Sequence, residues 1–266
     1  MSIIYINPFQ FGLAYDADAQ NYINRVIAAD VAAGNTSGLE VGVQDAINDF
    51  FVGCKADGIW SAIKACCILA GARTLDGALV PLVGGAPTNF NFVSGDYDRE
   101  TGLVGDGSTK YLDSNRSNNA DPGTNHHLGV FASSIQTGLS IGARQGGIGT
   151  GGRYLALNAF RDVPSTDTSQ SFGSAVAGNS TFVGTSRTSS SEYVARIGAA
   201  SSTIASTSTA PIIASLFVFA QNTAGVGPQS FTTSRLAFYS IGESLDLAAL
   251  DTRVSNLITA IGAAIP

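Results

Sequence analysis

The hydrophobic residues of this chain recur with two different periods, which divide it into a helical part and a β-rich part. From residue 16 to about residue 71, apolar side chains recur every three to four positions, the spacing of one face of an α-helix. Asp16 and Asp18 favour a helix start through capping and charge, and Gly34 favours its end. The pattern predicts a first helix through about residue 33, with a buried stripe of Ala19, Tyr22, Ile23, Val26 and Ile27.

A second helical stretch runs from about Gly38 to Lys55, and a third follows the turn at residues 57–58. Both stripes are narrow, as expected for helices that pack on a sheet or on each other. We therefore expect helix as far as about residue 71 and an ordinary core role for all of these residues. The second stripe contains Val43, Ala46, Ile47, Phe50, Phe51 and Cys54, and the third contains Ile59, Trp60, Ile63, Cys66 and Cys67.

From about residue 73 the hydrophobic period changes to two, the spacing of half-buried β-strands. Clusters of Gly, Asn, Ser and Pro separate the alternating segments, as turns do. Many short strands at fairly even spacing predict a sandwich or a barrel. Residues 212–220 are apolar on both faces, which predicts a central strand covered on both sides, with the helices on one of them. The predicted strands lie at 110–114, 127–133, 153–160, 181–187, 192–198, 211–220 and 234–241.

The two ends of the chain have patterns of their own. Residues 245–264 carry another amphipathic stripe, which Ser244 or Asp246 can cap, and they predict a C-terminal helix. Residues 1–12 look extended, and an arm with so many large apolar groups would not stay free in water. It packs either on its own domain or on a neighbouring subunit. The residues expected to mediate assembly through this arm are Ile3, Ile4, Tyr5, Phe9 and Phe11.

The predicted organisation therefore has four parts. They are an apolar arm at 1–12, a helical segment at 13–72, a β-sandwich at 73–245 and a helix at 246–266 that packs on the sandwich.

The scarcity of charged residues in this chain bears on the kinds of partner that it can bind. Charged residues make up 13% of it, about half of the roughly 25% that is usual, and 31 glycines with many Ser, Thr and Asn residues take their place. This mixture suits a surface that lies against other protein copies, where charge would have to be desolvated. The formal net charge is −6 and no run of Lys or Arg is present, which argues against nucleic acid as a partner.

The N-terminus and the cysteines bear on the compartment. The N-terminus lacks a basic start and its apolar run is broken at Asn7 and Pro8, so we expect neither a signal peptide nor membrane insertion. Cys54, Cys66 and Cys67 are odd in number and two are adjacent, which indicates small core residues in a chain that folds in a reducing cytosol. No Cys or His spacing is typical of a zinc site.

Two motifs carry a resemblance to a known family. Residues 102–112, Gly-Leu-Val-Gly-Asp-Gly-Ser-Thr-Lys-Tyr-Leu, place a tight turn before a Tyr-Leu strand. Residues 235–242, Arg-Leu-Ala-Phe-Tyr-Ser-Ile-Gly, precede Ser244, Leu245 and a helix. In this order and spacing, residues 73–245 resemble concanavalin A-like jelly rolls of the laminin-G type. The fold implied is mainly β: a concanavalin A-like jelly-roll sandwich with an N-terminal α-helical segment and a C-terminal helix.

The whole chain, including the turn at residues 55–60, also resembles structural proteins of tailed bacteriophages. It is similar to proteins of cyanophages and other marine phages, which join a helical lead segment to such a jelly roll. The resemblance implies a non-enzymatic role on the virion, as head decoration, tail component or fibre tip. The partners implied are other copies of the chain, other virion proteins and host-surface glycan. The chain would be made and folded in the host cytoplasm.

The two histidines, His126 and His127, are adjacent in a predicted strand. They therefore point to opposite faces and cannot hold one metal ion together. Neither is accompanied by a nucleophile motif such as G-x-S-x-G. We expect them to be polar residues at a strand edge.

Asp96 and Asp98 lie in a loop before the Gly-Asp-Gly-Ser turn. Closely spaced carboxylates can bind Ca²⁺, and some laminin-G-type domains carry calcium, so this ion is the one cofactor candidate. The alternative is a pair of solvated turn carboxylates, because a complete ligand set is not recognisable. A glycosidase also needs two acids. Jelly-roll glucanases place theirs on one strand as E-x-D-x-E, and the lack of such a strand argues against hydrolysis.

Residues 142–152 are rich in glycine but contain no Gly-Lys-Ser/Thr, so they predict a long loop and not a phosphate site. Loops on a rigid sandwich are common places for binding. Arginine and aromatic side chains stack on sugar rings and anchor protein interfaces equally well. The predicted glycan or partner contacts are Arg153, Tyr154, Arg161, Tyr193 and Arg196.

Three functions follow from these patterns. The first is a virion structural protein that assembles through its arm and helices, and the second is a glycan-binding host-adhesion module. The two are compatible, since a virion protein can also adhere. The third, less favoured, is a polysaccharide hydrolase.

Overall fold

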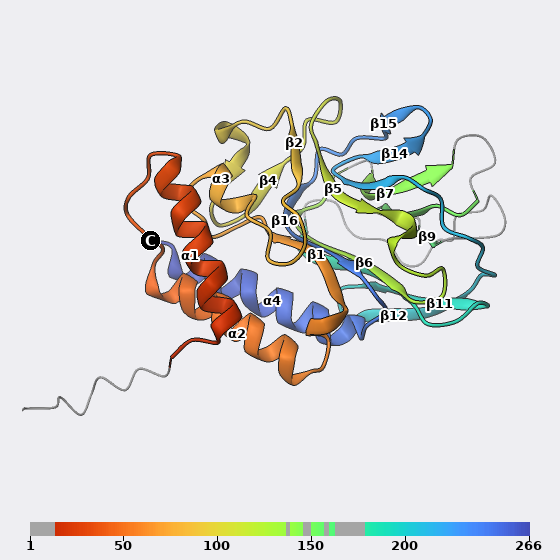
Figure 1. The fold of residues 1–266 in the computed structure, drawn as a ribbon, viewed down its shortest axis with the longest axis horizontal. Coiled ribbons are helices and arrows are strands. Elements are labelled where there is room, and N and C mark those ends of the chain that lie inside the picture. Colours follow the sequence, from red (N-terminus) through yellow and green to blue (C-terminus); the bar gives the residue numbers. More distant parts are fainter. Residues whose placement is uncertain (1–13, 137–138, 146–149, 157–159, 163–178) are drawn as a thin grey trace, which may run out of the picture.

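A layer of helices packs on a sandwich of two β-sheets (Figure 1). The computed structural model describes residues 14–136, 139–145, 150–156, 160–162 and 179–266, and for residues 139, 140, 156, 160 and 161 it describes the backbone alone. Within this part, no helix is long and apolar enough to cross a membrane. The helices are α1 (Ala17–Ala32), α2 (Val41–Ala56), the short α3 (Leu75–Ala78) and α4 (Leu247–Ala264), with 3-10 turns at Trp60–Ala62, Ser94–Asp96 and Asn118–Ala120.

The first sheet lies next to the helices and the second lies beyond it. The first has the order β12 (Ala200–Ala205), β11 (Glu192–Ile197), β10 (Thr181–Arg187), β6 (His126–Ser134), β16 (Arg235–Gly242), β4 (Gly102–Val104) and β3 (Tyr97–Asp98), and β1 (Ile63–Ile68) also pairs with β16. The second has the order β15 (Gly227–Gln229), β14 (Gln221–Ala224), β7 (Leu139–Gln145), β13 (Ser215–Val218), β5 (Tyr111–Ser117) and β2 (Thr88–Phe90). Next to β7 lies β8 (Arg153–Ala156), which pairs with β9 (Phe160–Asp162). The protein is thus a mainly β sandwich with few helices.

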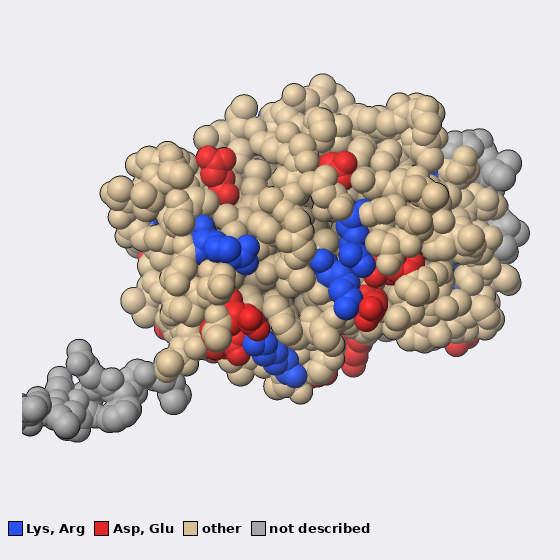
Figure 2. Space-filling model, in the orientation of Figure 1, with Lys and Arg blue, Asp and Glu red and all other residues tan. Residues whose placement is uncertain are grey.

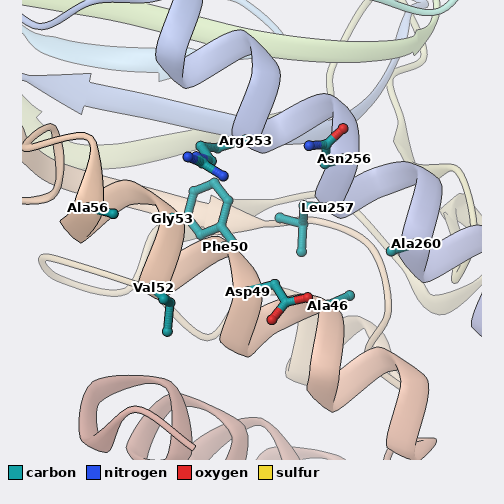
Figure 3. Close-up of a pocket in the computed structure, with 10 residues that line it drawn as sticks. All are labelled: Ala46, Asp49, Phe50, Val52, Gly53, Ala56, Arg253, Asn256, Leu257 and Ala260. Atoms are coloured by element: carbon teal, nitrogen blue, oxygen red, sulfur yellow. The ribbon is translucent and has the colours of Figure 1, made fainter.

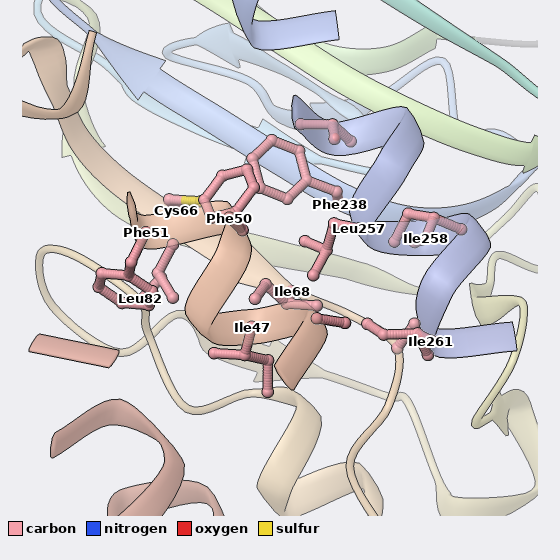
Figure 4. Close-up of a cluster of buried hydrophobic side chains, with 14 of the residues drawn as sticks. Ile47, Phe50, Phe51, Cys66, Ile68, Leu82, Phe238, Leu257, Ile258 and Ile261 are labelled. Carbon is pink, nitrogen blue, oxygen red and sulfur yellow. The ribbon is translucent and has the colours of Figure 1, made fainter. Parts of the chain in front are cut away.

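Two separate hydrophobic cores hold the three layers together. One lies between the helices and the first sheet, where the rings of Phe50 on α2 and Phe238 on β16 meet at 5.7 Å (Figure 4). The other lies between the sheets and contains Leu128, Ile141 and Tyr239. Because β16 faces both cores, nearly all of its side chains are buried.

The predicted third helical stretch is wrong over residues 63–68. These residues form β1, which pairs with β16 through Cys66 opposite Ser240 and Cys67 opposite Tyr239. Cys66 faces the helices and Cys67 faces the second sheet, so both sides of this strand are buried. A run that is apolar on both sides fits a helical period as well as a buried strand. All three cysteines are free and buried, as predicted.

The prediction that the helices cover one face of the strand at residues 212–220 is also wrong. Strand β13 does lie between two neighbours, β5 and β7, but in the second sheet. The helices cover the first sheet, in which β16, like β1, has both faces buried against side chains. Both segments are apolar runs of similar length, so the pattern alone did not distinguish them.

The Gly-Asp-Gly-Ser motif forms the tight turn that the sequence predicts. The Asp106 carboxylate accepts hydrogen bonds from the backbone N–H groups of Ser108, Thr109 and Lys110 at 2.8–3.0 Å. Gly107 has φ +75°, a conformation that residues with a side chain rarely adopt. The turn leads directly into β5, so it fixes where that strand begins.

Candidate functional site

A group of fully buried polar and charged side chains connects the two sheets at one end of the sandwich. The Asp162 carboxylate of β9 lies 2.7 Å from Nε2 of His126 on β6 and accepts a hydrogen bond of 3.0 Å from Nε of Arg187 on β10. All three side chains are completely buried. Burial by itself would raise the pKa of Asp162, but His126 and Arg187 outweigh it and hold this pKa below its ordinary value. The group therefore joins the sheets as a charged bridge, named the Asp162 bridge below.

Two predicted contact residues belong to the surroundings of this bridge. Arg153 is fully buried and directs its Nε at Oδ1 of Asn118, 2.5 Å away. Tyr193 is 2% exposed and its ring lies 5.1 Å from the Arg187 guanidinium. The predicted surface role of Arg153 and Tyr193 is therefore wrong, because both side chains face the space between the sheets. The alternation of side chains along a strand allowed these two side chains to point either outward or inward. Their direction depends on the partners that they find between the sheets.

The two histidines point to opposite faces of β6, as predicted, but neither lies at a strand edge. His127 is fully buried, with Nδ1 2.5 Å from the Glu243 carbonyl and Nε2 2.7 Å from the Ser240 hydroxyl. A carbonyl only accepts, so Nδ1 is the donor and Nε2 accepts from the hydroxyl of Ser240. This is the neutral ring, and burial lowers the pKa of His127 to about 4. The edge prediction is wrong because β10 and β16 flank β6 on both sides.

The outer face of the second sheet carries a row of paired residues that crosses five strands. Thr88, Asp113, Phe217, Gly142 and Tyr154 lie opposite one another on β2, β5, β13, β7 and β8. Residues paired in this way share one face of a sheet. The neighbouring positions, Leu112, Val218, Ile141 and Leu155, are buried in the core between the sheets. The row therefore faces outward, and it includes the predicted contact residue Tyr154.

Aromatic rings gather at the β2 end of this row. The rings of Phe90 and Tyr111 are stacked at 4.4 Å with 4° between their planes. Phe217 meets Tyr111 at 4.6 Å, and Phe231 meets it at 6.2 Å. Phe90 is 37% exposed and Tyr111 is half-buried. We call Phe90, Tyr111, Phe217 and Phe231 the aromatic platform; it places ring surface beside the half-buried Asp113 carboxylate.

The predicted contact residue Arg196 lies at a different place, between the first sheet and α4. Its guanidinium forms an ion pair of 2.9 Å with Asp251 and donates to the Ser201 hydroxyl at 2.9 Å. It lines a cavity of about 490 Å³ that Phe131, Thr181 and Ser255 also line. The ion pair holds β11 to α4, so Arg196 has a structural role besides any contact.

A second groove runs between α2 and α4 (Figure 3). Its volume is about 430 Å³, and Phe50 and Leu257 form its apolar floor. Arg253 lies over Gly53 and holds Asp57 in an ion pair of 2.7 Å. The groove is therefore partly apolar and partly charged.

Asp96 and Asp98 both use their carboxylates within the protein. Asp96 forms an ion pair of 2.5 Å with Lys110 and accepts from the Val93 N–H, while Asp98 accepts from Thr101. The two carboxylates therefore serve different turns. Among the described residues, no group of three or more His, Cys, Asp or Glu side chains could hold a metal ion. Calcium binding stays a prediction.

Some predicted site residues lie outside the described part of the chain. They are the arm residues Ile3, Ile4, Tyr5, Phe9 and Phe11, and the side chain of Arg161, whose backbone pairs with Tyr154. The predicted glycine-rich loop begins later than expected, because residues 142–145 belong to β7, and residues 146–149 also lie outside the description.

Sequence reasoning missed the platform and the Asp162 bridge. The platform combines residues from β2, β5, β13 and the segment after β15, and each ring alone looks like an ordinary strand residue. A signal was present in Tyr111, which belongs to the recognised motif at residues 102–112. For the bridge the signal was weaker, since an Arg or Asp in a strand is usually exposed.

Among the comparisons with known proteins, only the one with solved structures finds similar proteins. No family model and no curated protein matches the chain. A Trypanosoma rangeli sialidase mutant that displays trans-sialidase activity is 11% identical with a TM-score of 0.44, over 84% of this chain and 40% of the sialidase. Domain 4 of an extracellular GH43 arabinanase from Geobacillus stearothermophilus, in complex with arabinotriose, is 12% identical with a TM-score of 0.37. The match covers 66% of this chain and 82% of the arabinanase domain. The chain thus spans about two fifths of the length of the sialidase it is compared with.

Proposed function

We propose that this chain is a non-enzymatic structural protein of a tailed-bacteriophage virion. In this proposal its sandwich is a concanavalin A-like jelly roll that binds host-surface glycan on the outer face of the second sheet. The observation that carries the glycan part is the aromatic platform beside Asp113. The apolar face of a sugar ring packs on an aromatic ring, and a carboxylate accepts hydrogen bonds from sugar hydroxyls.

The virion part rests on the sequence resemblance and on the scarcity of charge. Figure 2 shows charged side chains in a few small groups on one face of the molecule, with broad uncharged surface between them. Several charged residues of the described chain are paired with one another; Lys55, for example, lies 2.6–2.7 Å from Asp16 and Asp18. A surface of this kind loses little when it is buried against another protein, because few charges have to be desolvated.

Replacing Tyr111 by alanine is expected to weaken glycan binding at least about tenfold, because buried aromatic contacts often contribute 2 kcal/mol or more to an interface. The measurement is affinity electrophoresis against a panel of neutral and acidic host-type polysaccharides, followed by titration calorimetry with a polysaccharide that binds. Tyr111→Phe keeps the ring and serves as the matched control. Binding that is equal in Tyr111→Ala, Tyr111→Phe and wild type would exclude the platform. Release of reducing ends would instead identify a hydrolase.

Deleting residues 1–12 is expected to abolish self-association and attachment to particles, since this arm carries most of the apolar surface predicted for assembly. Sedimentation of the purified protein measures the first, and antibody labelling of intact particles measures the second. A deletion variant that is folded, by circular dichroism, and still attaches to particles would contradict the role of the arm.

A further inference from the structure

The groove between α2 and α4 stays open because small side chains line it next to a point where the two helices touch. A Cβ on Gly42 would come within 2.8 Å of the Cβ of Ala264, so no space is left between the helices there. One turn further along each helix the walls include Ala46 and Ala260, and the groove has a volume of about 430 Å³ (Figure 3). This volume lies within the usual range of ligand pockets, about 300–1,000 Å³. The groove is therefore large enough to take side chains from another segment.

The walls of the groove also carry polar side chains that have no hydrogen-bond partner among the described residues. Asp49 on α2 and Asn256 on α4 stand on the two sides of the groove (Figure 3). An extended segment has backbone N–H and C=O groups that need partners when it is buried. A carboxylate accepts from N–H groups, and a side-chain amide both donates and accepts. The groove thus combines an apolar floor with hydrogen-bonding groups, as an extended apolar segment requires.

The chain enters the described structure next to this groove. The Tyr15 hydroxyl donates to the Asp45 carboxylate at 2.6 Å, and the Asp16 N–H donates to Oδ1 of Asn48 at 2.8 Å, so the start of α1 is held on α2. Each of these two α2 residues is followed in sequence by a residue that lines the groove. Residues 1–13 precede this anchor and can span up to about 45 Å when extended, whereas a helix of the length of α2 is about 24 Å long. The arm therefore starts beside α2 and is longer than the groove.

The composition of the arm fits a partner surface of this kind. Residues 1–13 contain no Asp, Glu, Lys or Arg, and their large side chains include the aromatic rings of Tyr5, Phe9 and Phe11. An aromatic side chain buries about 150–250 Å², so the rings of two arms would together bury roughly 900–1,500 Å². Stable interfaces bury about 1,200–2,000 Å² in total. Two arms exchanged between two copies reach this size once the surface of the grooves is added.

We propose that the arm of one copy lies in the α2–α4 groove of a second copy, and that two copies exchange their arms reciprocally around a two-fold axis. This inference rests on the proposed function, in which the arm mediates self-association, and it names the surface that receives the arm. Exchange of an identical element between two copies is a low-cost route to a dimer, because each groove receives the same segment that its own chain carries.

The test combines a variant that lacks the groove with a variant that lacks the arm. Ala260→Arg fills the groove with a long side chain and keeps the arm, whereas deletion of residues 1–12 keeps the groove. Ala260 is exposed, so the substitution leaves the hydrophobic cores unchanged. Sedimentation is expected to show a dimer for wild type and a monomer for each variant. Thr259→Arg, at an exposed position of α4 outside the groove, is the matched control and should dimerise like wild type.

An equimolar mixture of the two variants is expected to form a heterodimer, since one supplies an arm and the other a groove. It should be weaker than the wild-type dimer, because only one of the two arms finds a groove. Dimerisation of Ala260→Arg at wild-type strength, or a mixture that stays monomeric, would overturn the groove as the receptor of the arm. If deletion alone abolished association, the assembly role of the arm would still stand. Association that survives the deletion would instead contradict the proposed function.

A fluorescent peptide of residues 1–13 gives a second measurement, which does not depend on the folding of Ala260→Arg. We expect it to bind the deletion variant in fluorescence anisotropy. Phe9→Ser and Phe11→Ser together in the peptide should weaken this binding at least about tenfold. Equal binding of the two peptides, or no binding of the unchanged one, would count against the proposal. A wild type that is monomeric although the peptide binds the deletion variant would place each arm in its own groove and so exclude the exchange.

Discussion

The Asp162→Asn variant is expected to lose roughly 3–5 kcal/mol of unfolding free energy, the usual cost of breaking a buried ion pair from one side. Asparagine has nearly the same shape, so the loss arises from charge and not from packing. The buried Arg187 guanidinium would keep its positive charge and lose its anionic partner. Nε2 of His126 would likewise face an amide in place of a carboxylate. Denaturant titration followed by circular dichroism measures the change.

An exposed ion pair offers the control for this experiment. Asp57 pairs with Arg253 at 2.7 Å on the surface of the helical layer, where water screens the interaction. Asp57→Asn should leave the unfolding midpoint almost where it is in wild type. Similar midpoints for Asp57→Asn and Asp162→Asn would mean that the bridge does not act as a buried charge pair.

The double variant Asp162→Leu with Arg187→Met distinguishes the attraction within the ion pair from the cost of burying its two charges. Removing both charges abolishes the uncompensated guanidinium, so part of the loss seen in Asp162→Asn should return. A double variant that is less stable than Asp162→Asn would show that the hydrogen bonds of Arg187 to Ser189, Glu192 and Ser206 carry the stability instead.

The period of the hydrophobic residues predicted most elements because most of them bury one face. The helix at residues 17–32 and the strand at residues 192–197 each alternate between buried and exposed positions. The pattern failed at residues 63–68, where both faces are buried, and there neither period has a polar side to mark it. Strand β16 is buried in the same way, but the recognised motif before the C-terminal helix identified it.

The candidate site was less predictable, because it depends on contacts between distant residues. Tyr154 and Arg153 are neighbours in sequence, and alternation sends one outward and the other between the sheets. Which of the two faces outward depends on Asn118, which is 35 positions away. The aromatic platform likewise joins Phe90 and Phe217, whose common neighbour Tyr111 is known only once the strand order is known.

Acid is expected to destabilise the protein between about pH 6.5 and pH 4 because of His127. In the unfolded chain this histidine has its ordinary pKa of 6.5, whereas burial lowers it to about 4 in the native state. Between these values the unfolded state binds a proton that the native state does not, so stability falls as the pH decreases through this window. A difference of this size corresponds to about 3 kcal/mol. Above pH 6.5 both states hold the neutral ring, and His127 contributes no pH dependence.

The His127→Gln variant isolates this effect, since a glutamine can still donate to the Glu243 carbonyl but cannot titrate. We expect it to be less stable than wild type at pH 7, where the packing of the ring is lost. Its stability should nevertheless decline less steeply than that of wild type from pH 6.5 to 4, as measured by urea unfolding at closely spaced pH values. Carboxylates such as Asp162, whose pKa is held below its ordinary value, are common to both proteins and cancel in the comparison. Protonation of His127 in the native state is unfavourable, because the ring is enclosed and its Nε2 accepts from the Ser240 hydroxyl. Parallel stability curves for the two proteins would therefore contradict the prediction, since they would mean that His127 binds its proton equally well in the native and the unfolded state.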